Sequence, residues 1–121
     1  MTFREILEHV VGQTPGAVAG SIMGTDGVAI EEFAASGADL DLNTLTVEYG
    51  AVLEQLRKVS GSLYGDAEAL EEIVICARDH QLFFRPIDED YLFVVALEPN
   101  GMLGKARYLV RSVLGALREE L

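Results

Sequence analysis

The chain is poor in the residues that usually carry chemistry. Its 121 residues include no tryptophan, one cysteine and two histidines. With Cys76 as the only cysteine, an intrachain disulfide is excluded, which fits a reducing compartment. His9 and His80 fall in different predicted elements, and neither has a second histidine or cysteine spaced to share a metal ion. We therefore expect no metal site and no cofactor.

Basic residues are also scarce, with 9 Lys and Arg against 20 Asp and Glu, for a formal net charge of −11. None lies between Arg4 and Arg57, whereas four gather near the end of the chain: Lys105, Arg107, Arg111 and Arg118. A surface this negative repels phosphate backbones, so we expect no nucleic-acid partner. We interpret the acidity as a source of solubility, with steering toward a basic partner as the alternative.

No apolar run reaches the roughly 18 residues that a membrane-spanning helix needs. The start, MTFREILEHV, has no basic segment followed by an apolar core, which a secretory signal would require. We expect a cytoplasmic protein that does not insert into membranes.

Catalytic motifs are missing as well. The sequence has no phosphate-binding G-x-x-x-x-G-K-[ST] loop, no G-x-G-x-x-G dinucleotide fingerprint and no serine-centred elbow. Adjacent acids on a strand point to opposite faces, so pairs such as Glu31 and Glu32 do not converge as a catalytic dyad. Cys76 is interpreted as a small buried hydrophobic residue inside a strand. We expect no catalytic residue; an enzyme would need a cluster of distant residues such as Arg85, Arg107 and Glu72.

What the chain does contain is the composition of one globular domain, residues 1–121, with 50% hydrophobic and 24% charged residues. Helical spacing of apolar residues predicts a helix over 2–13, with Thr2 and Glu5 in capping-box positions. Asp26-Gly27 between two apolar runs predicts a hairpin with strands at about 17–24 and 28–34.

The longest predicted element is a helix that begins after Asp39 or Asp41, either of which could cap it, and ends at Gly61 or Gly65. Eight residues form one apolar stripe along it: Leu42, Leu45, Tyr49, Val52, Leu53, Leu56, Val59 and Leu63. Beside the stripe lies a patch of small residues, Thr46, Gly50 and Ala51. Two interpretations stay open for this patch: it packs on the domain's own sheet, or a second helix crosses it in a dimer.

Three strand-like runs follow at 69–78, 81–87 and 91–97, and a last helix at about 102–120. The run YLFVVAL at 91–97 is apolar throughout, as expected of a central strand covered on both faces. Pro86 places the preceding run near a strand end. The element order α-β-β-α-β-β-β-α, rich in hairpins, predicts an α+β fold with a sheet that is not parallel.

Three strings carry a resemblance to a known family: PGAVAGSIMGTDGVAIEEF, LTVEYGAVLEQLRKV and DYLFVVALEPNGMLGKARYLVRSVL. In order and spacing they resemble the Roadblock / dynein light-chain family, in particular its bacterial MglB type, over nearly the whole chain. The resemblance implies a five-stranded antiparallel, profilin-like sheet, with the long middle helix on one face and the other two helices on the opposite face.

The resemblance also implies a homodimer in which middle helices pack together and third strands pair into a continuous sheet. It would place nine residues at the dimer interface and partner-binding surface: Leu45, Thr46, Tyr49, Gly50, Leu53, Arg57, Leu70, Glu72 and Val74. Such dimers regulate or scaffold small Ras-like GTPases without catalytic residues of their own. The alternatives are a pure scaffold subunit of a larger complex, or a ligand sensor with YLFVVAL as the floor of its pocket.

Overall fold

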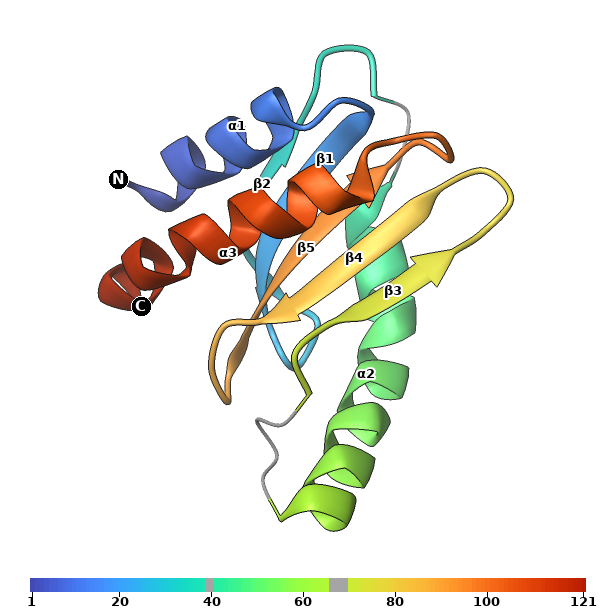
Figure 1. Ribbon diagram of the computed structural model, residues 1–121, viewed down its shortest axis with the longest axis vertical. Helices are drawn as coiled ribbons and strands as arrows, with labels where there is room; N and C mark the ends of the chain where they lie inside the picture. Colours follow the sequence, from blue (N-terminus) through green and yellow to red (C-terminus); the bar gives the residue numbers. More distant parts are fainter. Residues whose placement is uncertain (39–40, 66–69) are drawn as a thin grey trace.

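Five antiparallel strands form a single sheet between two layers of helices in the computed structural model, which describes residues 1–38, 41–65 and 70–121 (Figure 1). The elements are α1 (Phe3–Gln13), β1 (Ala17–Gly24), β2 (Ala29–Ala34), α2 (Leu42–Tyr64), β3 (Ile73–Cys76), β4 (Gln81–Pro86), β5 (Tyr91–Leu97) and α3 (Leu103–Glu120). The strands are arranged in the order β2-β1-β5-β4-β3. Helices α1 and α3 cover one face and α2 lies against the other, which confirms the expected α+β fold.

The local signals at the start of the chain are confirmed. The Thr2 hydroxyl accepts the N–H of Glu5 at 3.1 Å, and the Glu5 carboxylate accepts the N–H of Thr2 at 3.0 Å. In the first hairpin, Gly27 has a φ of 88°, a left-handed conformation that glycine adopts without a steric cost. Asp26 supports the same turn by accepting the N–H of Val28 at 3.0 Å.

Strand β5 lies at the centre of the sheet and supplies both hydrophobic layers. Phe93, Val95 and Leu97 pack toward α1 and α3, whereas Leu92, Val94 and Ala96 pack toward α2. All six side chains are buried. Residues 92–97 of the run YLFVVAL are therefore core, and their packed side chains do not support its predicted use as the floor of a ligand pocket.

Strand β3 is shorter than predicted, and Cys76 is not buried. The expected strand over 69–78 is paired only from Ile73 to Cys76, and residue 69 lies outside the described residues. The chain turns directly after Cys76, where the N–H of Ala77 donates to the carbonyl of His80 at 2.9 Å. Cys76 is exposed because it is the last residue of an outermost strand. The prediction of a buried cysteine was wrong, since alternation along a strand does not reveal whether the strand is at an edge.

Helix α2 begins at the predicted cap. The Asp41 carboxylate accepts hydrogen bonds from the N–H of Thr44 at 3.1 Å and from the Thr44 hydroxyl at 2.6 Å. The helix ends at Gly65, which has a left-handed conformation. The other predicted cap, Asp39, lies outside the described residues. None of the described helices is both long enough and apolar enough to cross a membrane.

Candidate functional site on helix α2 and the sheet edges

The predicted single stripe of α2 separates into two faces in the structure. One face lies on the sheet and buries residues three or four positions apart, with exposed fractions of 1% for Thr46, 2% for Leu53 and 6% for Arg57. Arg57 also donates from Nη2 to the carbonyl of Asp88 at 3.1 Å. Gly50 is buried on the same face, where an added Cβ would lie 3.9 Å from Cα of Gly27.

These four residues therefore pack within their own domain. Within the small-residue patch, Thr46 and Gly50 pack on the domain's own sheet, whereas Ala51 is exposed. The predicted place of the four residues at the dimer interface and partner-binding surface stays a prediction, with little of Thr46, Leu53 and Arg57 exposed in a single chain. The sheet-facing side of α2 could not be identified from the sequence, because helical periodicity alone does not show which side of a broad apolar stripe meets the sheet.

The second face of α2 lies beside the buried one and is exposed and apolar. We call Val52, Leu56, Val59 and Leu63 the outer α2 seam; their exposed fractions are 53%, 40%, 52% and 70%. In Figure 1 the second half of α2, which carries most of the seam, extends past the edge of the sheet. Exposed apolar residues gathered along one helix face are typical of an interaction surface.

The outer α2 seam continues toward the start of the helix through Leu45 and Tyr49, which are half-buried. The positions 45, 49, 52, 56, 59 and 63 alternate in steps of four and three, and this is the repeat that lets two helices pack along a shared seam. Leu45 and Tyr49 are thus the predicted α2 residues that keep a place at a candidate interface. The seven-residue spacing of these positions is already present in the sequence. It is hidden when the residues of both faces are counted as one stripe.

The two outer strands of the sheet leave part of their backbone unpaired. In an antiparallel pair, opposite residues alternate between bonded and non-bonded positions. The N–H of Ala35 donates to the carbonyl of Val18, so these two residues form a bonded pair. Bonded and non-bonded positions alternate from there along β2, and Glu32, opposite Ser21, takes a non-bonded position. The backbone N–H and C=O of Glu32 therefore point outward from the edge strand β2.

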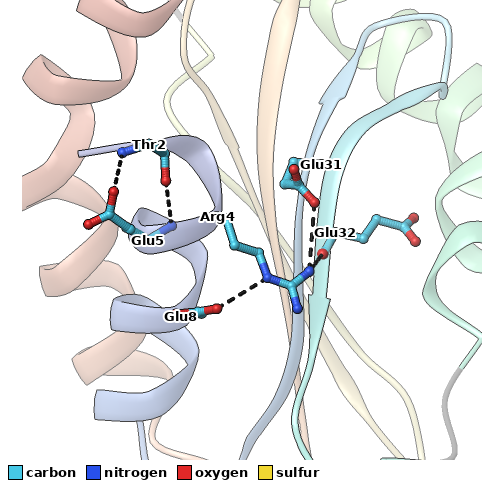
Figure 2. Close-up of polar contacts among 6 residues, drawn as sticks. All are labelled: Thr2, Arg4, Glu5, Glu8, Glu31 and Glu32. Atoms are coloured by element: carbon cyan, nitrogen blue, oxygen red, sulfur yellow. Dashed lines mark hydrogen bonds and ion pairs between the residues drawn. The ribbon is translucent and has the colours of Figure 1, made fainter.

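Arg4, in the first turn of α1, covers this edge of β2 (Figure 2). Its Nη1 donates to the outward carbonyl of Glu32 at 2.9 Å and lies 3.7 Å from Oε1 of Glu31. Its Nε donates to Oε1 of Glu8 at 3.2 Å, and its guanidinium lies 5.0 Å from the centre of the Phe33 ring. A strand adding to β2 would have to displace Arg4 from the Glu32 carbonyl.

The opposite edge, at β3, is open. The pairing of Ala77 with His80 fixes the alternation, so the backbone groups of Val74 and Cys76 point outward. Across residues 1–38, 41–65 and 70–121, no side chain donates to or accepts from these groups as Arg4 does at β2. Of the two sheet edges, β3 is therefore the one prepared for a further strand.

The three predicted residues near β3 have different surroundings. Val74 turns its side chain toward the α1 and α3 layer and is half-buried. Leu70 is also half-buried and lines a small hollow with Arg85 and Arg118. Glu72 is held by Arg107 of α3, so its side chain serves the domain's own packing.

Glu72 and Arg107 form a two-pronged ion pair between the start of β3 and helix α3. Nε of Arg107 lies 2.8 and 3.0 Å from the two carboxylate oxygens, and Nη2 lies 2.8 Å from one of them. Hydrogen bonding to Glu72 and its negative charge raise the pKa of Arg107 above its ordinary value. Arg85 is not part of this pair, and its Nε is buried without a partner among the described residues.

Within the distant cluster of Arg85, Arg107 and Glu72, the contact that the structure shows is thus the ion pair between Glu72 and Arg107. In the part of the chain that the structure describes, no group of three His, Cys, Asp or Glu side chains is arranged to hold a metal ion.

Comparison with solved structures identifies the fold. MglC from Myxococcus xanthus is 38% identical, matches 100% of both chains and superposes with a TM-score of 0.71. The gliding protein MglB from Thermus thermophilus is 22% identical, with 97% of this chain and 86% of that chain covered and a TM-score of 0.82. A Roadblock/LC7 domain from Streptomyces avermitilis is 14% identical over 98% and 97% of the two chains, with a TM-score of 0.79. No family model and no curated protein matches the sequence.

The likeness to MglB and to the Streptomyces domain establishes the fold, and the likeness to MglC also extends to sequence over the full length. It confirms the family resemblance noted in the sequence, and in identity this chain lies nearer to MglC than to the MglB proteins compared. The chain belongs to the Roadblock family.

Proposed function

We propose that this chain is a non-catalytic, homodimeric regulatory or adaptor protein that binds a small Ras-like GTPase and modulates its nucleotide state or its location. The observation that carries the proposal is the outer α2 seam, an apolar helix face that the domain's own sheet does not use. Membership of the Roadblock family supports the GTPase as partner. The proposal places the protein in the cytoplasm, where such GTPases act.

The homodimer is supported by two features that agree. The outer α2 seam has the spacing of a helix that packs against another helix, and burial of its four large apolar residues would stabilise a dimer by several kcal/mol in order of magnitude. The open edge at β3 lets the sheet continue into a second copy, while Arg4 discourages the same event at β2. In this arrangement Leu45, Tyr49 and Val74 keep their predicted place near the interface.

The experiment that tests the partner is a pull-down with a Ras-like GTPase from the same organism, loaded either with GDP or with a non-hydrolysable GTP analogue. We expect binding that depends on the nucleotide, because a regulator must distinguish the two states. Failure to bind in either state would contradict the proposal. GTP hydrolysis measured with and without the chain then separates regulation from tethering.

A scaffold subunit is the second candidate, favoured by the same open surfaces. It predicts that the chain binds a partner and leaves the rate of GTP hydrolysis unchanged. The ligand-sensor alternative has lost its main support, because Leu92 to Leu97 are buried in the core.

A further inference from the structure

The exposed face of α3 differs in charge from the rest of this acidic protein. Between Leu103 and Leu117 its exposed positions carry basic, aromatic and small residues: Gly104, Lys105, Tyr108, Arg111, Ser112 and Gly115. The first carboxylate of the helix is Glu119, near its end. The α3 face, defined by these six residues, is therefore a positive surface on a chain whose formal net charge is −11.

The two cations of the α3 face have no carboxylate partner among the described residues. Lys105 and Arg111 form no ion pair with any described residue, although acidic residues outnumber basic ones by 20 to 9. Nζ of Lys105 instead lies 5.6 Å from the centre of the Tyr108 ring. Arg107 has a different role, since Glu72 holds it. Both unpaired cations thus keep their charge available to a partner.

The same face presents apolar surface of the kind found in protein interfaces. Tyr108 is 64% exposed, and Met102, one turn before Lys105, is 55% exposed. Tyrosine, methionine and arginine are enriched in interfaces, and tyrosine and arginine supply many of the residues on which binding depends. Gly104 and Ser112 lie one turn to either side of Tyr108, and their small size allows the backbone of another helix to approach.

We propose that the α3 face is a docking surface for an acidic amphipathic helix of a partner protein. Carboxylates of that helix pair with Lys105 and Arg111, and one of its apolar side chains packs on Tyr108 and Met102. Helix α3 covers the opposite face of the sheet from α2 (Figure 1), so the site stays accessible when the outer α2 seam is covered. The inference is thus independent of the proposed homodimer and its GTPase.

Charge favours a helix over the other anionic partners. An anionic membrane or a nucleic acid carries negative charge well beyond the width of one helix, and the remaining acidic surface of this chain would repel it. A partner helix brings only a few carboxylates, and these fall within the reach of Lys105 and Arg111.

The test measures fluorescence anisotropy of a labelled amphipathic helical peptide, with glutamates on its polar face and leucines on its apolar face, added to the full-length chain. We expect saturable binding, which the double variant Lys105→Glu/Arg111→Glu weakens by about tenfold or more, because two attractions become repulsions. Arg78→Glu is the matched control: Arg78 is an exposed cation in the turn after β3, outside the α3 face, and its reversal should leave binding near wild type.

Tyr108→Ala is a second test that leaves every charge in place and removes only exposed surface. It should weaken peptide binding while the far-ultraviolet circular dichroism stays unchanged. Equal losses in Arg78→Glu and in the double variant would overturn the proposal, because they would show a general charge effect.

Two further results would also overturn it. In the first, the chain does not bind the peptide but binds phosphatidylserine vesicles, and this binding depends on Lys105 and Arg111. That result would identify a membrane as the occupant. The other is self-association of the chain that the double variant abolishes, which would identify a second copy.

Discussion

Single side chains at the helix starts determine how α1 and α2 begin. Asp41 accepts both the backbone N–H and the hydroxyl of Thr44, and Glu5 closes the capping box with Thr2. Bonding to the Thr44 hydroxyl and N–H lowers the pKa of Asp41, and bonding to the backbone and hydroxyl of Thr2 lowers that of Glu5. Both carboxylates are therefore more acidic in the folded chain than in the unfolded one.

Asp41→Ala should lower the melting temperature at neutral pH, because the first turn of α2 loses an acceptor. A lowered folded-state pKa stabilises the fold above the ordinary value of 3.8, and that contribution disappears as the pH falls through the lower folded-state value. The wild type and Asp41→Ala should thus approach each other in stability in strong acid. Thermal melts across this range check it, with Asp41→Asn as a control that keeps an acceptor without the charge. A difference in melting temperature between wild type and Asp41→Ala that stays constant with pH would contradict the lowered pKa of Asp41.

Glu72→Gln should also destabilise the chain, because it removes the charge that Arg107 binds through two nitrogens. The Arg107 side chain is 38% exposed, so solvent screening limits the expected loss to about 1 kcal/mol. Urea unfolding at low and high salt measures it, and the difference from wild type should shrink in high salt. A loss that does not respond to salt would indicate packing as the cause.

At the scale of elements, the two faces of α2 are the main finding. The sheet-facing side is formed by small and apolar residues with Arg57, and the outer α2 seam lies beside it. Gly50 belongs to the first side and lies near Gly27 of the β1–β2 hairpin, with space for one methyl group. This position therefore reports on how α2 docks to its own sheet.

Gly50→Ala should stabilise the chain by about 0.5–1 kcal/mol, because alanine favours the helix and its Cβ finds no close contact. Gly50→Arg should destabilise it strongly, since a long charged side chain has no room between helix and hairpin. Chemical denaturation of both variants tests the orientation of α2. If Gly50→Arg folded as stably as wild type, this face of the helix would not lie on the sheet.

Elements with local signals could be predicted from the sequence, and those that depend on tertiary neighbours could not. The structure confirms the capping box at Thr2, the Asp26-Gly27 hairpin and the apolar central strand Tyr91–Leu97, each of which has its signal within a few residues. Three features depend on where an element lies relative to the sheet: the length of β3, the exposure of Cys76 and the orientation of α2. The periodicity of the sequence does not encode that position. The predicted interface residues stay a prediction, and the structure shows which of them are buried on the sheet and which are half-buried beside the outer α2 seam.

For the whole molecule, the sheet separates two surfaces of different character. The α2 side carries the apolar outer seam, and the α3 side carries the basic α3 face. One sheet edge is covered by Arg4, and the other is open at β3. Under the proposed function, the α2 side would hold a second copy and the α3 side would stay free for another partner.

We propose that the outer α2 seam is the homodimer interface, and sedimentation equilibrium measures the mass that distinguishes a dimer from a single chain. We expect the wild type to have about twice the 13.1 kDa mass of one chain, and Leu56→Glu/Val59→Glu to have the mass of one chain. Val47→Glu, an exposed valine on the same helix outside the seam, is the control and should stay a dimer. A wild type that sediments as a monomer, or a seam variant that remains a dimer, would contradict the claim.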